Sequence, residues 1–175
     1  MNNPTELKRA GNSRVFAIIA LLRNACQRIP DSAIALLARF SIAAIFWQSG
    51  QTKVEGLVID LLAGRVELGW PRLSDSALYL FREEYRLPLL DPEVAAFVAA
   101  SAEHLFPVLL LLGLGTRLAA SGLLVMTATI QLLVYPDAYA THGVWAVALL
   151  FLLAKGAGRF SLDHGLARRC GVVAP

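Results

Sequence analysis

Four long apolar stretches, separated by polar connections and by breaks that contain glycine or proline, dominate the pattern of this chain. A helix needs about 20 apolar residues, each rising about 1.5 Å, to cross a hydrocarbon core roughly 30 Å thick. The pattern therefore predicts an all-α fold, an integral membrane four-helix bundle with amphipathic interfacial helices. We expect the spans at about residues 32–50, 92–114, 116–135 and 141–155.

The second stretch has the clearest helix-end signals. Asp91 is a favourable N-cap, Pro92 suits the first helical position, and Glu93 suits the positive end of the helix dipole. Gly113 supplies a stop. Glu103 lies near the middle of this apolar helix, where a carboxylate is costly and needs a partner or a function.

The segments outside the membrane domain are expected to be cytoplasmic. Residues 1–31 form an N-terminal segment in which the first 14 residues are poorly ordered. Within it, Val15–Leu22 is too short to span and is expected to be an interfacial helix. Residues 32–166 form the membrane domain, and residues 167–175 form a C-terminal tail.

The long connection at residues 51–91 carries many charges and is expected to lie outside the cytoplasm. Val54–Ala63 and Ser74–Tyr85 both contain apolar residues at helical spacing, and Gly69-Trp70-Pro71 separates them. We therefore expect two amphipathic helices that lie on the membrane or cap the bundle.

Composition supports a membrane protein. Hydrophobic residues make up 57% of the 175 residues and charged residues 17%, against roughly 45–50% and 25% in soluble domains. The net charge of +3 gives no reason to expect a nucleic-acid partner. Cys26 and Cys170 are far apart and in no CxxC motif, so neither a disulfide framework nor a metal site is expected, and both are interpreted as inert thiols.

The basic residues predict an orientation in the membrane. Ten lie on the side of the termini, against five in the longer 51–91 connection, which has at least as many acidic residues. Both termini are therefore expected to be cytoplasmic, with the 51–91 connection and the Pro136–His142 turn facing outward. The ten are Lys8, Arg9, Arg14, Arg23, Arg28, Arg117, Lys155, Arg159, Arg168 and Arg169, and the five are Lys53, Arg65, Arg72, Arg82 and Arg86.

Arg39 is the expected counter-ion of Glu103. By helical rise Glu103 lies about 16 Å, and Arg39 about 10 Å, from the inner ends of their helices, so antiparallel neighbours would bring them within reach. In one interpretation Glu103 handles a proton or orients a ligand, with Arg39 neutralising its charge. In another, the pair only fixes helix register, and in a third Arg39 extends along its alkyl chain to the cytoplasmic surface.

Further polar residues lie toward the predicted outer side of the spans. Gln48 and Gln131 are about 22–24 Å from the inner face by rise, Lys53 follows Gln48, and Tyr135 shares a helix face with Gln131. Together they would line a cavity open to the outer leaflet and suited to a quinone head group or a small polar substrate. The alternative is hydrogen bonding between helices by the two glutamines.

The histidines in the spans do not predict a metal or haem site. His142 is expected roughly 16 Å nearer the outer end than His104, and the number of ligands that such sites require is not met. The sequence contains no cofactor motif of its own. The cofactor is therefore left open, with quinone as a candidate.

Five sequence blocks form a characteristic combination over about Leu37–Leu166. They are ARFSIAAIFWQSGQTKV, which contains Arg39 and Lys53, then EEYRLPLL, AEHLFPVLLLLGLGTRLAA, VYP and GAGRFSLD. Taken together, these blocks resemble the DoxX family of small bacterial membrane proteins. The resemblance implies a multi-pass, four-helix domain in the bacterial inner membrane and an association with redox metabolism. Some family members are subunits of thiosulfate:quinone oxidoreductase, and others are linked to oxidative-stress or thiol-redox complexes.

Two functions remain as hypotheses. The first is a component of a membrane redox system that binds quinone or a small sulfur or thiol compound, at most a subunit of an oxidoreductase, with a membrane or periplasmic redox partner. The second is a non-catalytic membrane scaffold or partner-binding subunit. A solute transporter has less support, because no broken helix or inverted repeat is visible. Small residues four positions apart in the spans predict tight helix contacts, within the chain or between copies, so a homo-oligomer is left open.

Overall fold

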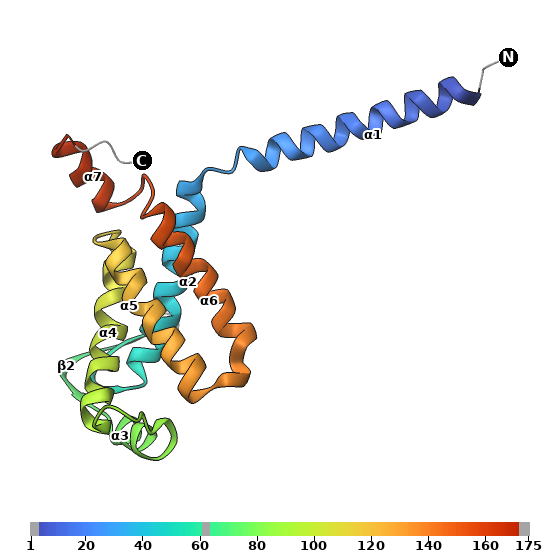
Figure 1. The fold of residues 1–175 in the computed structure, drawn as a ribbon. Helices are drawn as coiled ribbons and strands as arrows, with labels where there is room; N and C mark the ends of the chain where they lie inside the picture. Colours follow the sequence, from blue (N-terminus) through green and yellow to red (C-terminus); the bar gives the residue numbers. More distant parts are fainter. Residues whose placement is uncertain (1–3, 61–63, 172–175) are drawn as a thin grey trace.

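Four helical spans form an antiparallel bundle in the structure, a computed structural model (Figure 1). The structure describes the backbone of residues 4–60 and 64–171 and the side chains of residues 16–60 and 64–171. Each span is long and apolar enough to cross a membrane, so the predicted membrane bundle is confirmed. The spans are Asp31–Gln51, Pro92–Leu112, Thr116–Val134 and Pro136–Lys155.

The spans correspond to four helices with irregular turns near one end. Helix α2 is Asp31–Gln51, and α4 is Pro92–Leu112. Helix α5 (Thr116–Thr129) continues as the π-helical turn η2 (Ile130–Val134). Helix α6 (Tyr139–Lys155) follows the short 3-10 turn η3 (Pro136–Ala138).

The chemistry of the helix ends explains where α4 begins and ends. The Asp91 carboxylate accepts hydrogen bonds from the backbone N–H groups of Glu93 at 2.9 Å and Val94 at 3.4 Å, as an N-cap does. Gly113 ends the helix in the left-handed conformation, with φ +64°, which glycine adopts without steric cost. These local signals acted as the sequence predicted.

The connection between α2 and α4 corrects one sequence prediction. Strands β1 (Val54–Asp60) and β2 (Arg65–Leu73) form an antiparallel hairpin, so the helix expected over Val54–Ala63 is wrong for residues 54–60, and residues 61–63 lie outside the described residues. The β-branched residues of β1 favour a strand over a helix. The predicted helix at Ser74–Tyr85 is confirmed as α3 (Asp75–Tyr79) followed by the π-helical turn η1 (Leu80–Tyr85).

The two ends of the bundle differ in what covers them. The hairpin, α3 and η1 lie at one end, which we call the capped end, while α1 (Pro4–Gln27) and α7 (Leu162–Arg169) lie at the other, which we call the termini end (Figure 1). Because α2 and α5 run toward the capped end and α4 and α6 run away from it, neighbouring spans are antiparallel. This placement sets which residues can meet at each end.

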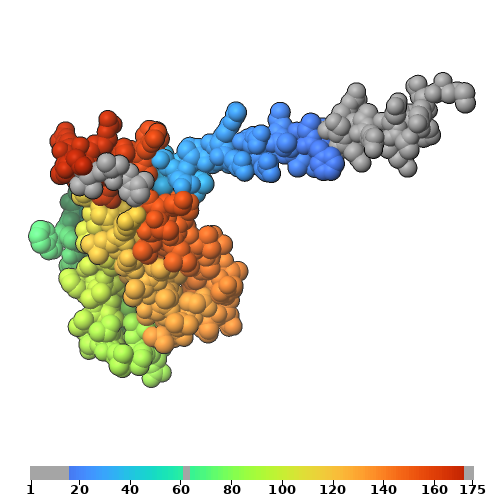
Figure 2. All heavy atoms as spheres, turned by 45° about the horizontal axis from the view of Figure 1, so that its top comes forward, coloured from blue at the N-terminus to red at the C-terminus, as the bar shows by residue number. Residues whose placement is uncertain are grey.

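Helix α1 is longer than the sequence predicted. It runs without a break over Pro4–Gln27 and projects away from the bundle (Figure 1). Figure 2 shows the same projection for its coloured part, residues 16–27. The poor order expected of the first 14 residues stays a prediction, and residues 1–3 lie outside the described residues. The stretch is polar, but its leucine, lysine, arginine and alanine residues are good helix formers, which explains the longer helix. The interfacial position of Val15–Leu22 stays a prediction.

Small side chains let the spans approach closely. Alanines and branched apolar residues of α2, α4, α5 and α6 form the main buried core, and a second core lies where η1 packs on α4. At Gly122 of α5, an added Cβ would come within 2.4 Å of the Phe106 ring of α4, so a larger residue there would force this ring to move. The main core comprises Ala35, Ala38, Ile42, Ala43, Phe46, Leu110, Ala119, Ala120, Leu123, Leu149 and Leu152, and the second Phe81, Ala95 and Ala96.

Asp163 fastens the termini end. Its carboxylate accepts hydrogen bonds from the backbone N–H groups of Gly115 at 2.8 Å and Thr116 at 3.0 Å, which caps the start of α5. Its own N–H donates to the carbonyl of Gly113 at 2.8 Å. The segment after the last span is thus tied to the loop between α4 and α5.

Candidate functional site

A buried ion pair joins α4 to the end of α2. Lys53 Nζ lies 2.8 Å from Glu103 Oε2 and donates a hydrogen bond to Glu103 Oε1 at 3.1 Å. The Ser49 hydroxyl donates to the same Oε1 at 3.0 Å and accepts from Lys53 Nζ at 3.0 Å. Because Lys53 is 5% and Glu103 2% exposed, each charge depends on the other for compensation.

Local sequence brings these three side chains together. Ser49 and Lys53 are four residues apart at the end of α2, so they share one face of the helical turn. Both backbone groups of Lys53 are hydrogen-bonded. Its N–H donates to the Gly50 carbonyl at 2.9 Å, and its carbonyl accepts from the Ser74 N–H at 3.0 Å. The start of the hairpin and its return to α3 therefore fix the position of the ammonium group.

Gly50 allows α2 and α4 to meet at this point. A Cβ placed on Gly50 would lie 2.9 Å from His104 Cε1 and 3.1 Å from Glu103 Cβ, which is closer than carbon atoms normally approach. Gly50 is the penultimate residue of α2, whereas Glu103 is about 16 Å from the start of α4 by helical rise. Glu103 is thus central along α4 but level with the capped end of α2.

One carboxylate oxygen retains hydrogen-bonding capacity. Glu103 Oε2 is buried and contacts Lys53 Nζ at 2.8 Å, but it accepts no hydrogen bond of good geometry. A carboxylate oxygen accepts more than one hydrogen bond, so Oε2 can accept one from a ligand.

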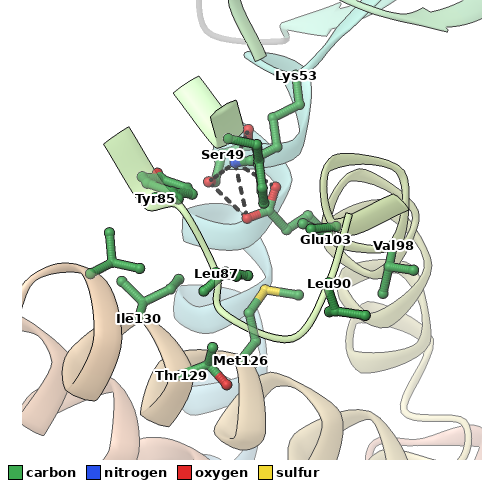
Figure 3. Close-up of a pocket in the computed structure, with 14 residues that line it drawn as sticks. Ser49, Lys53, Tyr85, Leu87, Leu90, Val98, Glu103, Met126, Thr129 and Ile130 are labelled. Atoms are coloured by element: carbon green, nitrogen blue, oxygen red, sulfur yellow. Dashed lines mark hydrogen bonds and ion pairs between the residues drawn. The ribbon is translucent and has the colours of Figure 1, made fainter. Parts of the chain in front are cut away.

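The ion pair forms the polar end of an otherwise apolar cavity of about 150 Å³ (Figure 3). In the close-up, Lys53, Ser49 and Glu103 meet at one side, while Met126, Thr129 and Ile130 of the α5 region lie on another. The segment that carries Leu87 and Leu90 crosses the cavity between them. The lining residues are Ser49, Lys53, Phe81, Tyr85, Leu87, Leu90, Ala95, Val98, Ala99, Glu103, Met126, Thr129, Ile130 and Val134.

Tyrosines connect this cavity to an exposed carboxylate. Tyr85 lines the cavity, and its ring packs edge-on against that of Tyr135, with 5.8 Å between ring centroids. The Tyr135 hydroxyl donates a hydrogen bond to the exposed Glu84 carboxylate, which raises the pKa of Tyr135. Burial raises the pKa of Tyr85. Both phenols therefore stay protonated hydrogen-bond donors at neutral pH.

His104 supports the site from its far side. Its Nδ1 contacts the carbonyl of Ala100 at 2.7 Å and its Nε2 contacts Gln51 Nε2 at 2.9 Å. A carbonyl only accepts, so Nδ1 carries the proton and Nε2 accepts from the Gln51 amide. Gln51 Oε1 in turn accepts from the Ile59 N–H at 2.7 Å, which fixes the amide orientation and ties β1 to α4.

Arg39 is not the counter-ion of Glu103, and this corrects the expected pair. Its guanidinium donates to backbone carbonyls at the end of α4 and in the segment after α6, and Lys53 occupies the place beside Glu103 instead. The cause is the offset between α2 and α4, because Arg39 is level with the α4 C-terminus, about 10 Å from Glu103 by rise. The carbonyls are those of Leu110 at 2.6 Å, Leu111 at 2.7 Å, Ala157 at 3.0 Å and Phe160 at 2.7 Å.

Of the other expected lining residues, Lys53 reaches the cavity and the glutamines do not line it. Gln48 is exposed on α2. Gln131 Nε2 donates to the Pro136 carbonyl at 2.6 Å, and Gln131 Oε1 lies 2.8 Å from His142 Nδ1. Gln131 therefore bridges the turn between α5 and α6. Tyr135 lies beside the cavity residue Tyr85.

Sequence reasoning missed Ser49 and Tyr85. Ser49 had a signal, because it stands four residues before Lys53 on the same helix face. Tyr85 had none, since its position depends on how the connection folds back over α4. His104 and His142 have separate partners, Gln51 and Gln131, and both cysteines are exposed.

Comparison with known proteins shows that the part of the chain carrying these residues matches a known protein family. The sequence profile described as DoxX matches residues 34–136, which is more than half of the 175 residues and includes Ser49, Lys53 and Glu103. A protein of Haemophilus influenzae, named as an uncharacterized protein, is 26% identical over 145 residues, covering 78% of this chain and 85% of that protein. No solved structure matches the chain.

Proposed function

The chain belongs to the DoxX family of membrane proteins, and we propose that it is a ligand-binding component of a membrane redox system. The observation that carries this proposal is the Lys53–Glu103 pair at the polar end of an apolar cavity of about 150 Å³. A cavity of this size holds about one six-membered ring. Apolar walls with a few convergent polar groups are the general form of a small-molecule site.

A quinone head group or a small sulfur or thiol compound fits this chemistry. Glu103 Oε2 would accept a hydrogen bond from a ligand O–H or S–H. The Ser49 hydroxyl and the Lys53 ammonium already donate within the site, so Lys53 would favour a ligand oxygen through its charge. Reduction of a quinone takes up protons as well as electrons, and Glu103 is placed to hold such a proton beside the ligand. In this proposal the electrons come from a membrane or periplasmic redox partner.

The test is binding to purified protein in lipid nanodiscs. A short-chain ubiquinol, thiosulfate and cysteine are each titrated into wild type, Glu103→Gln and Glu93→Gln. Ubiquinol and cysteine carry the O–H and S–H groups from which Glu103 Oε2 can accept. Glu93 is the matched control, because it is a carboxylate of α4 whose ion pair with Arg82 is exposed and outside the cavity. The proposal expects at least one compound to bind, with affinity lowered about tenfold or more in Glu103→Gln alone, as loss of a charged hydrogen bond predicts. Equal affinities in the three proteins would refute the role of Glu103.

The competing function is a non-catalytic scaffold or partner-binding subunit, in which the ion pair only stabilises helix packing. The close contact of α2 and α4 at Gly50 favours the scaffold function, because the Lys53–Glu103 pair lies at this contact and would hold the two helices together. The same titration separates the two functions, because a scaffold binds none of the three compounds. Purification from native membranes would then show a partner protein that stays bound after Glu103→Gln.

We also propose that the protein lies in the bacterial inner membrane with both termini in the cytoplasm. The excess of basic residues at the termini end supports this orientation. Alkaline phosphatase folds only outside the cytoplasm, so a fusion after Asp91 should be active and a fusion at the C-terminus inactive. The reverse pattern would overturn the orientation and leave the cavity unaffected.

A further inference from the structure

One face of the hairpin is apolar and uncovered. The register pairs Ile59 with Val66 and Leu57 with Leu68, and residues directly opposite each other share a face. On β2 these apolar side chains are largely exposed, with Val66 58% and Leu68 79%. Trp70, two residues beyond Leu68, is 87% exposed. Large apolar side chains gathered at this exposure mark an interaction surface.

The hairpin lies level with the last turn of a membrane span. Both backbone groups of Ile59 are bound by α2 side chains, since its N–H donates to Gln51 Oε1 at 2.7 Å and its carbonyl accepts from Trp47 Nε1 at 3.1 Å. Trp47 and Gln51 belong to the span Asp31–Gln51. Ile59 of β1 therefore lies beside the last turn of α2, and Figure 1 shows the hairpin projecting sideways next to α4.

We propose that this face of the hairpin inserts into the lipid leaflet at the capped end of the bundle. A tryptophan and branched apolar side chains beside exposed Arg65 and Arg72 are the composition of a segment that lies at the boundary between head groups and acyl chains. Phe97 of α4, the span that contacts β2, is also exposed, at 63%. The partner is thus the phospholipid surface, which the proposed ligand function does not require.

Lipid contact at the hairpin has a consequence for the buried pair. Lys53 directly precedes β1, and its carbonyl accepts from Ser74 just after β2. The hairpin base thereby positions the residue that neutralises Glu103. Insertion of the hairpin in the leaflet holds this base at a fixed depth.

Spin labels at two adjacent positions of β2 test the proposal in phospholipid bilayers. In a background with Cys26→Ser and Cys170→Ser, both of which are exposed sites, a nitroxide is attached to Leu68→Cys or to Glu67→Cys. Glu67 is the matched control, because it is exposed on the opposite face of the same strand. Collision with oxygen, which concentrates in lipid, is compared with collision with a water-soluble nickel chelate.

The proposal expects the label at position 68 to collide more with oxygen than with the chelate, and the label at position 67 to show the reverse. Equal, chelate-dominated values at both positions would mean that the apolar face lies in water and would overturn the proposal. A label at position 68 shielded from both reagents would mean that protein covers the face, as in a second copy, and would also overturn it. Helical circular dichroism of each labelled protein confirms that the bundle is folded.

Discussion

Lys53 and Glu103, fifty residues apart in the chain, form a buried ion pair in which the ammonium nitrogen contacts both carboxylate oxygens, at 3.1 Å and 2.8 Å. Lys53 lies just beyond the end of α2, and Glu103 lies in the middle of α4. A single charged side chain at such a position is expensive inside a membrane protein, whereas a matched pair is tolerated. The pair therefore fixes the end of α2 at the level of the middle of α4 and gives the adjoining cavity its polar end.

Removing one partner of this pair should destabilise the protein strongly. Lys53→Met leaves the Glu103 charge buried without compensation, which typically costs about 3–5 kcal/mol. The double variant Lys53→Met/Glu103→Gln should recover most of that loss, because no buried charge remains. The free energies of unfolding of wild type, both single variants and the double variant measure the coupling. Additive losses would show that the two groups do not stabilise each other.

Gly50 should be intolerant of even one added carbon. Gly50→Ala would bring its Cβ to 3.1 Å from Glu103 Cβ and 2.9 Å from the His104 ring, forcing α2 away from α4. Overpacking of this kind costs roughly 1–3 kcal/mol. Gly143→Ala in α6 is the control, because its nearest neighbour would lie at an ordinary 3.8 Å. Equal thermal stability of the two variants would contradict the close helix crossing.

Much of the bundle follows from local sequence, because apolar runs and cap residues such as Asp91 act within one helix. The counter-ion of Glu103 does not follow from local sequence. The depth of each residue in the membrane is counted along its own helix, which is valid between helices only if their ends lie at the same level. Gly50 instead packs beside Glu103, which shifts Arg39 to the C-terminus of α4 and Lys53 into the site. The hairpin was missed because seven residues, Val54–Asp60, are too few for spacing alone to separate a strand from a helix.

Arg39 should be irreplaceable by lysine. Its guanidinium donates to four backbone carbonyls contributed by α4 and by the segment after α6. A lysine ammonium cannot span these positions, so Arg39→Lys should leave at least one buried acceptor, such as the Ala157 carbonyl, unpaired, at about 1–3 kcal/mol. Arg117→Lys, at an exposed arginine with one long bond of 3.4 Å to Ala154, is the control. Unfolding in detergent compares the two, and similar losses would contradict a bracing role for Arg39.

Tyr135 should make the protein sensitive to strongly alkaline solution. Its hydrogen bond to Glu84 raises its pKa above the ordinary value of about 10. The folded protein keeps a proton that the unfolded chain releases, so this stabilisation is complete below a pH of about 10 and is lost as the pH rises further.

The ultraviolet difference spectrum of tyrosinate follows this ionisation directly. Tyr135→Phe should remove signal from the last part of the alkaline titration. Burial also raises the pKa of Tyr85, so part of the late signal should remain. A late signal of the same amplitude in wild type and Tyr135→Phe would show that Tyr135 is not the group held by Glu84.

The most direct test of the central claim, that the cavity beside Lys53 and Glu103 is a ligand site, is to fill it. Ala99 lines the cavity, so Ala99→Leu occupies its space and removes neither charge, while Ala128→Leu adds the same group on the exposed face of α5. The measurement is the rise in Tm that a short-chain ubiquinone, thiosulfate or cysteine causes in each protein. We expect one of these compounds to raise the Tm of wild type and Ala128→Leu and to leave that of Ala99→Leu unchanged. No rise in wild type, or the same rise in Ala99→Leu, would contradict the claim.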